Sequence, residues 1–129
     1  MSELILDAGG VSALAGQRAR LDALRRRGLW PAQIPVVVLV ESLTGDARQD
    51  YHTNILVKLS QVREVTEPLA REAARSRTAT SRAGTISATD AVVVAYATTR
   101  TDPVVLTSDP ADLARLAVGT DRPITIARA

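Results

Sequence analysis

Four acidic residues lie where apolar or small-residue stretches begin or end, at positions where core packing calls for no charge. They are Asp7 after ELIL, Glu41 after VVVLV, Asp90 before AVVVAYA and Asp109 after PVVLTS. An unpaired carboxylate is costly to bury, so an acid at the end of a buried element needs water, a hydrogen-bond donor or a cation beside it. Four such ends predict one shared cation site.

The types of residue present restrict which cation this site could take. The chain has no Cys and a single His, His52, which lies in the polar stretch DYHTN and is expected at the surface. Disulfides and thiolate zinc sites are therefore excluded, and a metal must be held by oxygen or by His52. Carboxylate oxygens favour Mg²⁺ or Mn²⁺ over zinc or copper.

Length and charge set the broad class. The 129 residues fit one domain spanning 1–129, and no apolar run approaches the roughly 20 residues that cross a bilayer. With no basic start of a secretory signal, we expect a soluble, cytoplasmic protein without a membrane partner. The formal charge is +2 from 16 basic and 14 acidic residues; without the four acids, ten acidic residues remain and the balance is +6, which favours a polyanionic partner.

Apolar periodicity predicts strands and helices in alternation along the chain. We expect strands at 3–7, near 62–65, at 103–107 and at 123–127, and helices at 17–28, 67–82, 88–99 and 109–118. Residues 34–43 are either a strand or a strand of three residues leading into a helix, 44–54 a loop or helix start, and 76–87 a surface loop or frayed helix end. This alternation predicts an α/β fold with a central parallel sheet of four to five strands flanked by helices.

The parallel sheet would bring the acids together. The carboxyl ends of parallel strands lie along one edge, and a crevice opens there where the strand order reverses. Asp7 and Asp109 follow strands directly and point to that edge. Glu41 and Asp90, just past a strand and at the start of a helix, can reach it.

The same segments resemble a known family. LDAGG at 6–10, Glu41 in VVVLVESL, ISATDAVVVAYA at 86–97 and TSDPADL at 107–113 together resemble the PIN-domain ribonucleases, in particular the VapC-like toxins of bacterial toxin–antitoxin pairs, over essentially the whole chain. The resemblance implies a PIN-like fold and an endoribonuclease that depends on Mg²⁺ or Mn²⁺. It further implies a small antitoxin as partner, and a homodimer.

Carried over residue by residue, the resemblance assigns catalysis and metal binding to Asp7, Glu41, Asp90 and Asp109, with Asp112 as a further acid that supports the metal. Whether one or two ions bind stays open. One position departs from the family pattern, which usually has a hydroxyl or amide residue shortly after the first Asp. Here Ala8, Gly9 and Gly10 stand there. Hydrogen bonds to metal-ligating residues can change metal affinity or activity by about 10- to 100-fold, so metal affinity or activity is expected to be lower than usual.

Helix capping is an alternative explanation for two of the acids. Asp109 followed by Pro110 and Asp112 has the pattern of a helix start, and Ser87 with Asp90 has the spacing of a capping box. The first two acids along the chain have no such explanation. A capping carboxylate can also ligate a metal, so the two interpretations are compatible.

The remaining candidates concern binding. Arg71, Arg75 and Arg82 fall on one face of the expected helix and are the best candidates for contacts to RNA phosphates. Most other arginines are expected on solvated helix faces. The helix expected at 88–99 is apolar on nearly all sides, which predicts cover by a sheet and by something else, such as a second subunit.

Two other classes of protein remain open. A phosphoacceptor signalling domain also gathers acids at strand ends, but it needs a Lys near its last strand, and the only Lys is Lys58 in mid-chain. A catalytically silent PIN-like module that binds RNA or protein is supported by the departure at Gly9 and Gly10.

Overall fold

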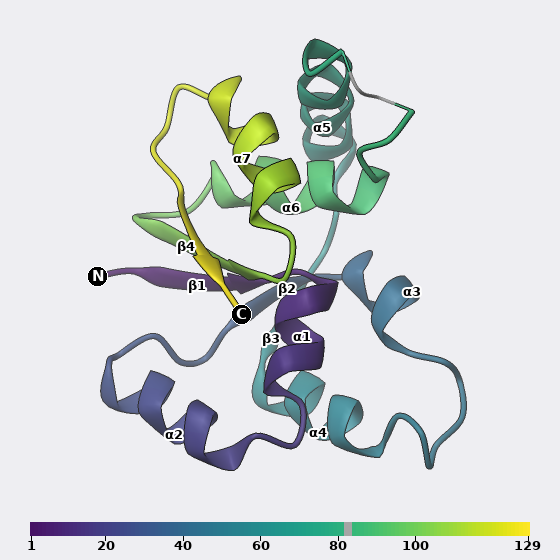
Figure 1. Cartoon of the computed structure of the whole chain (residues 1–129), viewed down its shortest axis with the longest axis vertical. Coiled ribbons are helices and arrows are strands. Elements are labelled where there is room, and N and C mark those ends of the chain that lie inside the picture. The colour runs from purple at the N-terminus through teal and green to yellow at the C-terminus, as the bar shows by residue number, and fades with distance from the viewer. Residues whose placement is uncertain (82–83) are drawn as a thin grey trace.

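A computed structural model of the chain describes residues 1–81 and 84–129 (Figure 1). Five strands form one sheet in the order β3-β2-β1-β4-β5, and all neighbouring strands are parallel. The strands are β1 (Glu3–Leu6), β2 (Gln33–Pro35), β3 (Gln61–Arg63), β4 (Pro103–Thr107) and β5 (Thr125–Arg128). The expectation of an α/β fold with a parallel sheet is confirmed.

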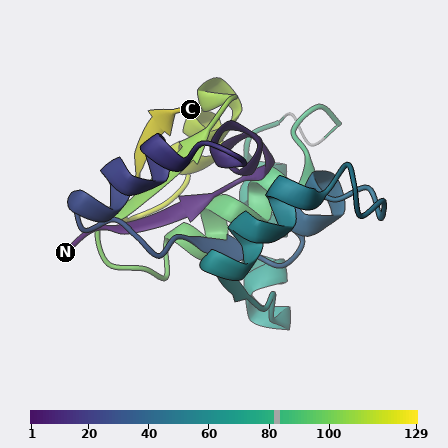
Figure 2. The ribbon, with the colours of Figure 1, turned by 90° about the horizontal axis from the view of Figure 1, so that it is seen from below.

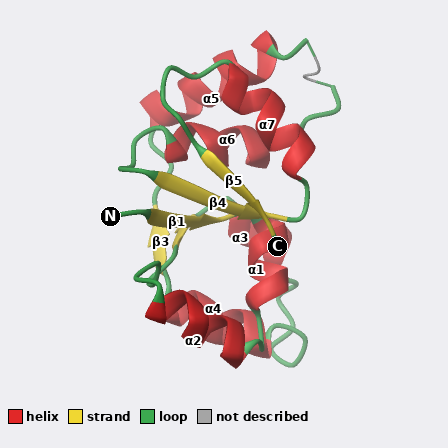
Figure 3. Ribbon diagram, turned by 60° about the vertical axis from the view of Figure 1, so that its left-hand side comes forward, coloured by secondary structure: helices red, strands yellow, loops and turns green. Residues whose placement is uncertain are grey.

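Helices cover both faces of the sheet (Figure 3). One face carries α1 (Ala8–Leu14), α2 (Arg18–Arg26) and α4 (Tyr51–Leu59), and the other carries α5 (Glu67–Ala79), α6 (Ala88–Ala97) and α7 (Pro110–Val118). The short helix α3 (Val38–Ser42) follows β2 and contacts α1. Among the described residues, no helix has the length and apolar character needed to cross a membrane.

Local sequence explains where the long helices begin and end. The Thr66 side chain caps α5 by accepting from the Leu69 N–H, and Ser87 caps α6 by accepting from the Asp90 N–H. Gly28, with φ +73, lies just past the end of α2 in a left-handed conformation that glycine adopts without strain. These signals were visible in the sequence, and the corresponding helices lie within a few residues of the expected bounds.

Three segments differ from expectation or settle an alternative. Residues 8–14 form α1, which was not predicted, because two consecutive glycines argue against a helix. Residues 34–43 follow the second alternative: the strand ends at Pro35 and the next residues turn into α3. The last strand occupies 125–128 instead of 123–127, and α5 ends at Ala79 instead of 82.

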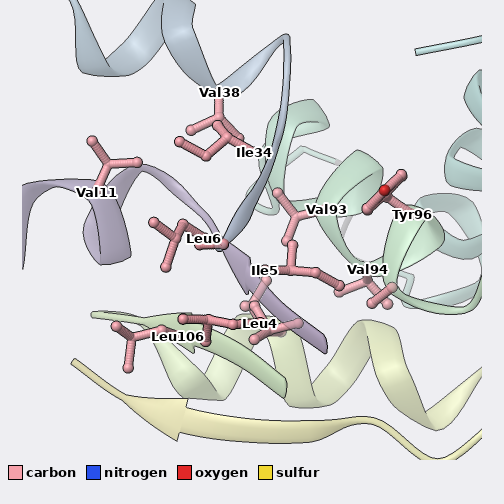
Figure 4. Packing of buried hydrophobic residues seen from close by; sticks show 14 of the residues in the cluster. Leu4, Ile5, Leu6, Val11, Ile34, Val38, Val93, Val94, Tyr96 and Leu106 are labelled. Atoms are coloured by element: carbon pink, nitrogen blue, oxygen red, sulfur yellow. The ribbon is translucent and has the colours of Figure 1, made fainter. Parts of the chain in front are cut away.

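The core lies between the sheet and the helices on each face. Side chains alternate along β1, so that Ile5 packs beside Val93 and Val94 of α6, while Leu6 faces the opposite side together with Leu106 of β4 (Figure 4). β1 is central and its residues Leu4, Ile5 and Leu6 are almost fully buried. A continuous apolar strand is therefore flanked on both faces, as expected in a parallel sheet.

Helix α6 is covered within the chain itself. Its buried residues are Thr89, Ala91, Val93, Val94, Ala95, Tyr96 and Ala97. Besides the sheet, α5 and α7 pack against it, so a second subunit is not needed to explain its apolar composition. A homodimer stays a prediction, without support from this helix.

Candidate metal and catalytic site

The site is built where the strand order divides. From the central strand β1 the chain passes to β2 and β3 on one side, and later to β4 and β5 on the other. Asp7 follows β1, and Asp109 follows its neighbour β4 two residues after Thr107. Both acids therefore lie at the carboxyl edge beside the point of divergence, which is where α/β sheets bind ligands.

Asp7 is a buried carboxylate with two hydrogen-bond donors. One oxygen accepts from the Gly10 N–H at 2.7 Å, which caps α1, and the other accepts from the Thr107 hydroxyl. Burial nevertheless raises the pKa of Asp7 above its ordinary value. Capping thus explains part of the placement of Asp7, contrary to the expectation that only the two later acids cap helices.

Thr107 is a site residue that sequence reasoning missed. Its side chain is fully buried, and its hydroxyl donates to Asp7 while accepting from the Asp109 N–H at 2.9 Å. A hydroxyl partner for Asp7 is therefore present, supplied by β4 instead of by residues 8–10. The available signal was a polar residue closing the apolar strand PVVLT.

Close packing explains why glycines follow Asp7. A Cβ atom at Gly10 would lie 2.4 Å from the Leu106 carbonyl oxygen, and one at Gly9 would lie 2.1 Å from Ser108 Oγ and 2.7 Å from Ser108 N. Any side chain at either position would push α1 away from β4. The glycines therefore have a packing role, and their presence is no sign of a lost function.

Asp90 shows that the acids affect one another. It lies in the first turn of α6, where Ser87 caps the helix. Burial, followed by the negative charges of Asp7, Glu41 and Asp109, raises the pKa of Asp90 to about 6. The four acids predicted from the sequence thus lie within electrostatic reach of one another.

The other acids are more accessible. Asp109 occupies the N-cap position of α7, but its side chain makes no capping hydrogen bond, so capping alone does not explain it. Glu41 is exposed in α3. Asp112 lies in the first turn of α7 and pairs with Arg115 at 2.9 Å.

Whether this site fits a metal ion depends on the chemistry of its side chains and on their positions. Carboxylates that repel one another have the chemistry that suits Mg²⁺ or Mn²⁺. Within residues 1–81 and 84–129, however, no three or more His, Asp or Glu side chains form a group that could hold a metal ion. Binding would therefore require the carboxylates to reorient toward the ion. The single histidine, His52, is exposed on α4, as expected.

The predicted phosphate-contacting arginines lie on α5. Arg71 pairs with Glu67 at 2.8 Å, and Arg75 pairs with Glu72. Both guanidinium groups already have an acidic partner on their own helix. Arg82 falls outside the residues that the structure describes.

Comparison with solved structures identifies the fold. Neither a family model nor a curated protein sequence matches the chain. A chain of DNA-bound VapBC from Salmonella typhimurium is similar with a TM-score of 0.71 and 18% identity, over 99% of this chain and 98% of that chain. A chain of VapBC2 from Rickettsia felis is similar with a TM-score of 0.66 and 13% identity, over 98% of each chain. PAE2754 from Pyrobaculum aerophilum is similar with a TM-score of 0.64 and 20% identity, over 96% of this chain and 83% of that chain. The chain therefore has the PIN-like fold that the motifs predicted.

The hydroxyl of Thr107 should contribute more to stability than its methyl group. Thr107→Val keeps the volume but leaves one oxygen of Asp7 and the Asp109 N–H without a partner, at a cost of about 1–3 kcal/mol. Thr107→Ser keeps the hydroxyl and loses one methyl group, worth about 0.8 kcal/mol. Urea unfolding of both variants in chelator should rank Val as the less stable. A Val variant as stable as the Ser variant would show that this hydrogen bond is not needed.

Asp90→Asn should change how stability depends on pH. Because the folded protein raises the pKa of Asp90 from 3.8 to about 6, its contribution to stability is fully present below 3.8 and is lost as pH rises through 6. In chelator, the melting temperature of wild type should therefore rise relative to that of Asp90→Asn as the pH falls from 7 to 5. At pH 7 the variant should melt at the same or a higher temperature.

The control for this experiment is Asp121→Asn, which removes an exposed acid from the turn after α7 and should follow the wild-type pH dependence. If Asp90 acts only on the helix dipole, which is worth about 0.3–1 kcal/mol, Asp90→Asn melts below wild type at both pH values. That outcome would remove Asp90 from the acidic cluster.

Proposed function

We propose that this protein is an endoribonuclease that hydrolyses RNA phosphodiesters with Mg²⁺ or Mn²⁺. The observation that carries the proposal is that four acids from separate elements gather at the carboxyl edge of the sheet, where Thr107 joins Asp7 to Asp109 and the other acids help to raise the pKa of Asp90. Perturbed carboxylates gathered at such a switch point are typical of functional sites.

Asp7, Glu41, Asp90 and Asp109 would hold the ion, with Asp112 as a further acid. A bound divalent ion acidifies a water molecule and neutralises charge developing on the phosphate. The protein itself must keep the carboxylates in place, and Thr107 does this for Asp7. Asp112 is engaged by Arg115, so we assign the orientation of the attacking water to exposed Glu41.

A phosphoacceptor signalling function is disfavoured by the position of Lys58. This residue lies in the last turn of α4, directly before β3 begins at Gln61. It is therefore near the amino end of a strand, whereas the acids lie at the carboxyl ends. Lys58 is the only Lys, so the chain has no lysine ammonium group to assist phosphoryl transfer at the acids.

A catalytically silent PIN-like module is the second candidate. It is favoured by one observation, that no group of three ligands is assembled among the described residues. The glycines after Asp7 no longer support it, because packing against β4 accounts for them.

The ribonuclease proposal predicts cleavage of RNA, and not of double-stranded DNA, by the purified protein in Mg²⁺ or Mn²⁺. Calcium should substitute poorly because its looser coordination misplaces the attacking water. Asp7→Asn and Asp109→Asn should lose cleavage, whereas Asp22→Asn, which removes an acid from α2, should keep it. Cleavage that persists unchanged in excess EDTA contradicts the metal mechanism. If the protein binds RNA without added metal, and neither wild type nor any variant cleaves it, the catalytically silent module is favoured.

We further propose that the protein is the toxin of a toxin–antitoxin pair. Similar solved structures include VapBC and FitAB, and this chain has exposed apolar residues suited to a partner helix. Tyr51, Ile55 and Leu59 are exposed large hydrophobic residues on one face of α4. They line a groove of about 410 Å³ between α2 and α4, together with Leu21.

This role predicts that expression arrests growth of a bacterial host and that co-expression of the small protein encoded beside it restores growth. Ile55→Asp should keep the arrest but lose the rescue, because a charge in the groove disfavours an apolar partner helix. Val118→Asp alters an exposed apolar residue of α7 away from the groove and should still be rescued. Unaffected growth with an active purified enzyme would contradict the toxin role.

A further inference from the structure

Helix α2 lies beside the β4–β5 side of the sheet (Figure 2). A second groove, on the other side of α2 from the first, is lined by residues of this helix and of these two strands. It has a volume of about 270 Å³. Apolar residues of α1, α2 and the two strands line it, together with the arginines Arg20, Arg27 and Arg128. Three cations around a partly apolar groove form a candidate anion-binding surface.

These three guanidinium groups are available for a ligand. All three residues are exposed, and none has an acidic side chain within ion-pair distance among the described residues. One nitrogen of Arg20 donates to the Ala13 carbonyl oxygen at 3.2 Å, which leaves its other donors free. Arg20 and Arg27 are seven residues apart, about two turns, and so lie on one face of α2.

Four other arginines on the helices are paired with acids of their own helix. Arg25, Arg71, Arg75 and Arg115 each pair with an acid three or four residues away on the same helix. Such pairs lower the positive charge that the residue presents to a polyanion. Within the described part of the chain, Arg18 and Arg26 of α2 also lack an acidic partner, so what distinguishes the basic groove is that it gathers such arginines around one depression.

The groove adjoins the acidic site. Arg128 is the β5 partner of Thr107, and the Ala129 N–H donates to the Thr107 carbonyl oxygen at 2.7 Å. Neighbouring strands lie about 4.8 Å apart, and the hydroxyl of the same Thr107 holds Asp7. The groove thus begins one strand away from the carboxylates.

We propose that the groove of Arg20, Arg27 and Arg128 binds phosphates of single-stranded RNA next to the bond that the acidic site cleaves. The carboxylates repel a phosphodiester chain, and guanidinium groups beside them offset that repulsion and fix its path. Aromatic residues make up only 2% of the chain, so base stacking contributes little and salt-dependent phosphate contacts dominate. The proposal rests on the proposed ribonuclease function, although RNA binding is measured without cleavage.

The test uses the full chain carrying Asp90→Asn, which on the proposed function should prevent cleavage, and a fluorescently labelled 12-nucleotide oligouridylate. Fluorescence anisotropy at several salt concentrations gives the affinity and its salt dependence. Adding Arg20→Ala and Arg27→Ala should weaken binding roughly tenfold at low salt. The slope of log affinity against log salt should fall in magnitude by about 1.4, corresponding to two lost phosphate contacts.

The matched control adds Arg18→Ala and Arg26→Ala, which remove the same charge from the same helix outside the basic groove. It should bind within about twofold of the parent. Equal losses in the two pairs would mean that only net charge matters and would overturn the proposal, as would no loss in the groove pair. If the groove pair does not fold, Arg128→Ala alone should reduce the slope by about 0.7.

A labelled hexaglutamate peptide tests the other possible occupant, an acidic protein segment. If this peptide depends on Arg20 and Arg27 while the oligouridylate does not, the proposal is overturned. The outcome is independent of catalysis in the wild-type protein. If RNA binding depends on the groove arginines but the wild-type protein does not cleave RNA, the groove proposal stands and the nuclease proposal is refuted. If the wild-type protein cleaves RNA but binding does not depend on these arginines, only the groove proposal is refuted.

Discussion

A buried hydrogen bond between a hydroxyl and a carboxylate organises the carboxyl edge of this sheet. Thr107 and Asp7 are 100 residues apart in the chain, yet they lie at the ends of the two paired strands where the topology divides. Leaving the buried hydroxyl or this carboxylate oxygen without a partner would cost about 1–3 kcal/mol. The bond therefore fixes the direction of the Asp7 side chain, and the same hydroxyl accepts from the Asp109 N–H to set the start of α7. The close approach of α1 to β4 that accompanies it leaves no room for side chains at Gly9 and Gly10.

The arrangement of helices explains how one edge tolerates four like charges. Asp7 caps α1, Glu41 and Asp90 lie in the first turns of α3 and α6, and Asp109 stands at the N-cap position of α7. Asp7, Asp90 and Asp109 thus lie at the positive ends of helix dipoles, a favourable interaction of about 0.3–1 kcal/mol each, whereas α3 is too short to offer Glu41 the same support. Capping and metal binding consequently share the same positions and are not competing explanations. The pKa of Asp90 is still raised to about 6, so the dipoles leave repulsion that a cation would relieve.

Sequence patterns were informative where the structure depends on neighbours along the chain. The continuous apolar runs of β1 and β4 placed Asp7 and Asp109 at strand ends, and cap residues placed α5 and α6. Features that depend on contacts between residues far apart in the sequence could not be predicted from it. The helix α1 contains two glycines whose reason lies in β4, and the partner of Thr107 follows a different strand. The burial of α6 was evident from its composition, but that α5 supplies the cover is a consequence of the tertiary fold.

Fold similarity and the inference of function rest on different observations. At 18% identity and a TM-score of 0.71, most side chains differ while the backbone path is kept, because a parallel α/β sheet requires only the right apolar pattern and turns. The fold alone therefore does not specify a chemistry. The acids are different, since burial and mutual repulsion raise the pKa values of Asp7 and Asp90, which opposes folding at neutral pH. A chain under selection for the fold alone would gain stability by replacing one of them. The presence of all four at one edge, against that cost, is the physical argument that they perform a function.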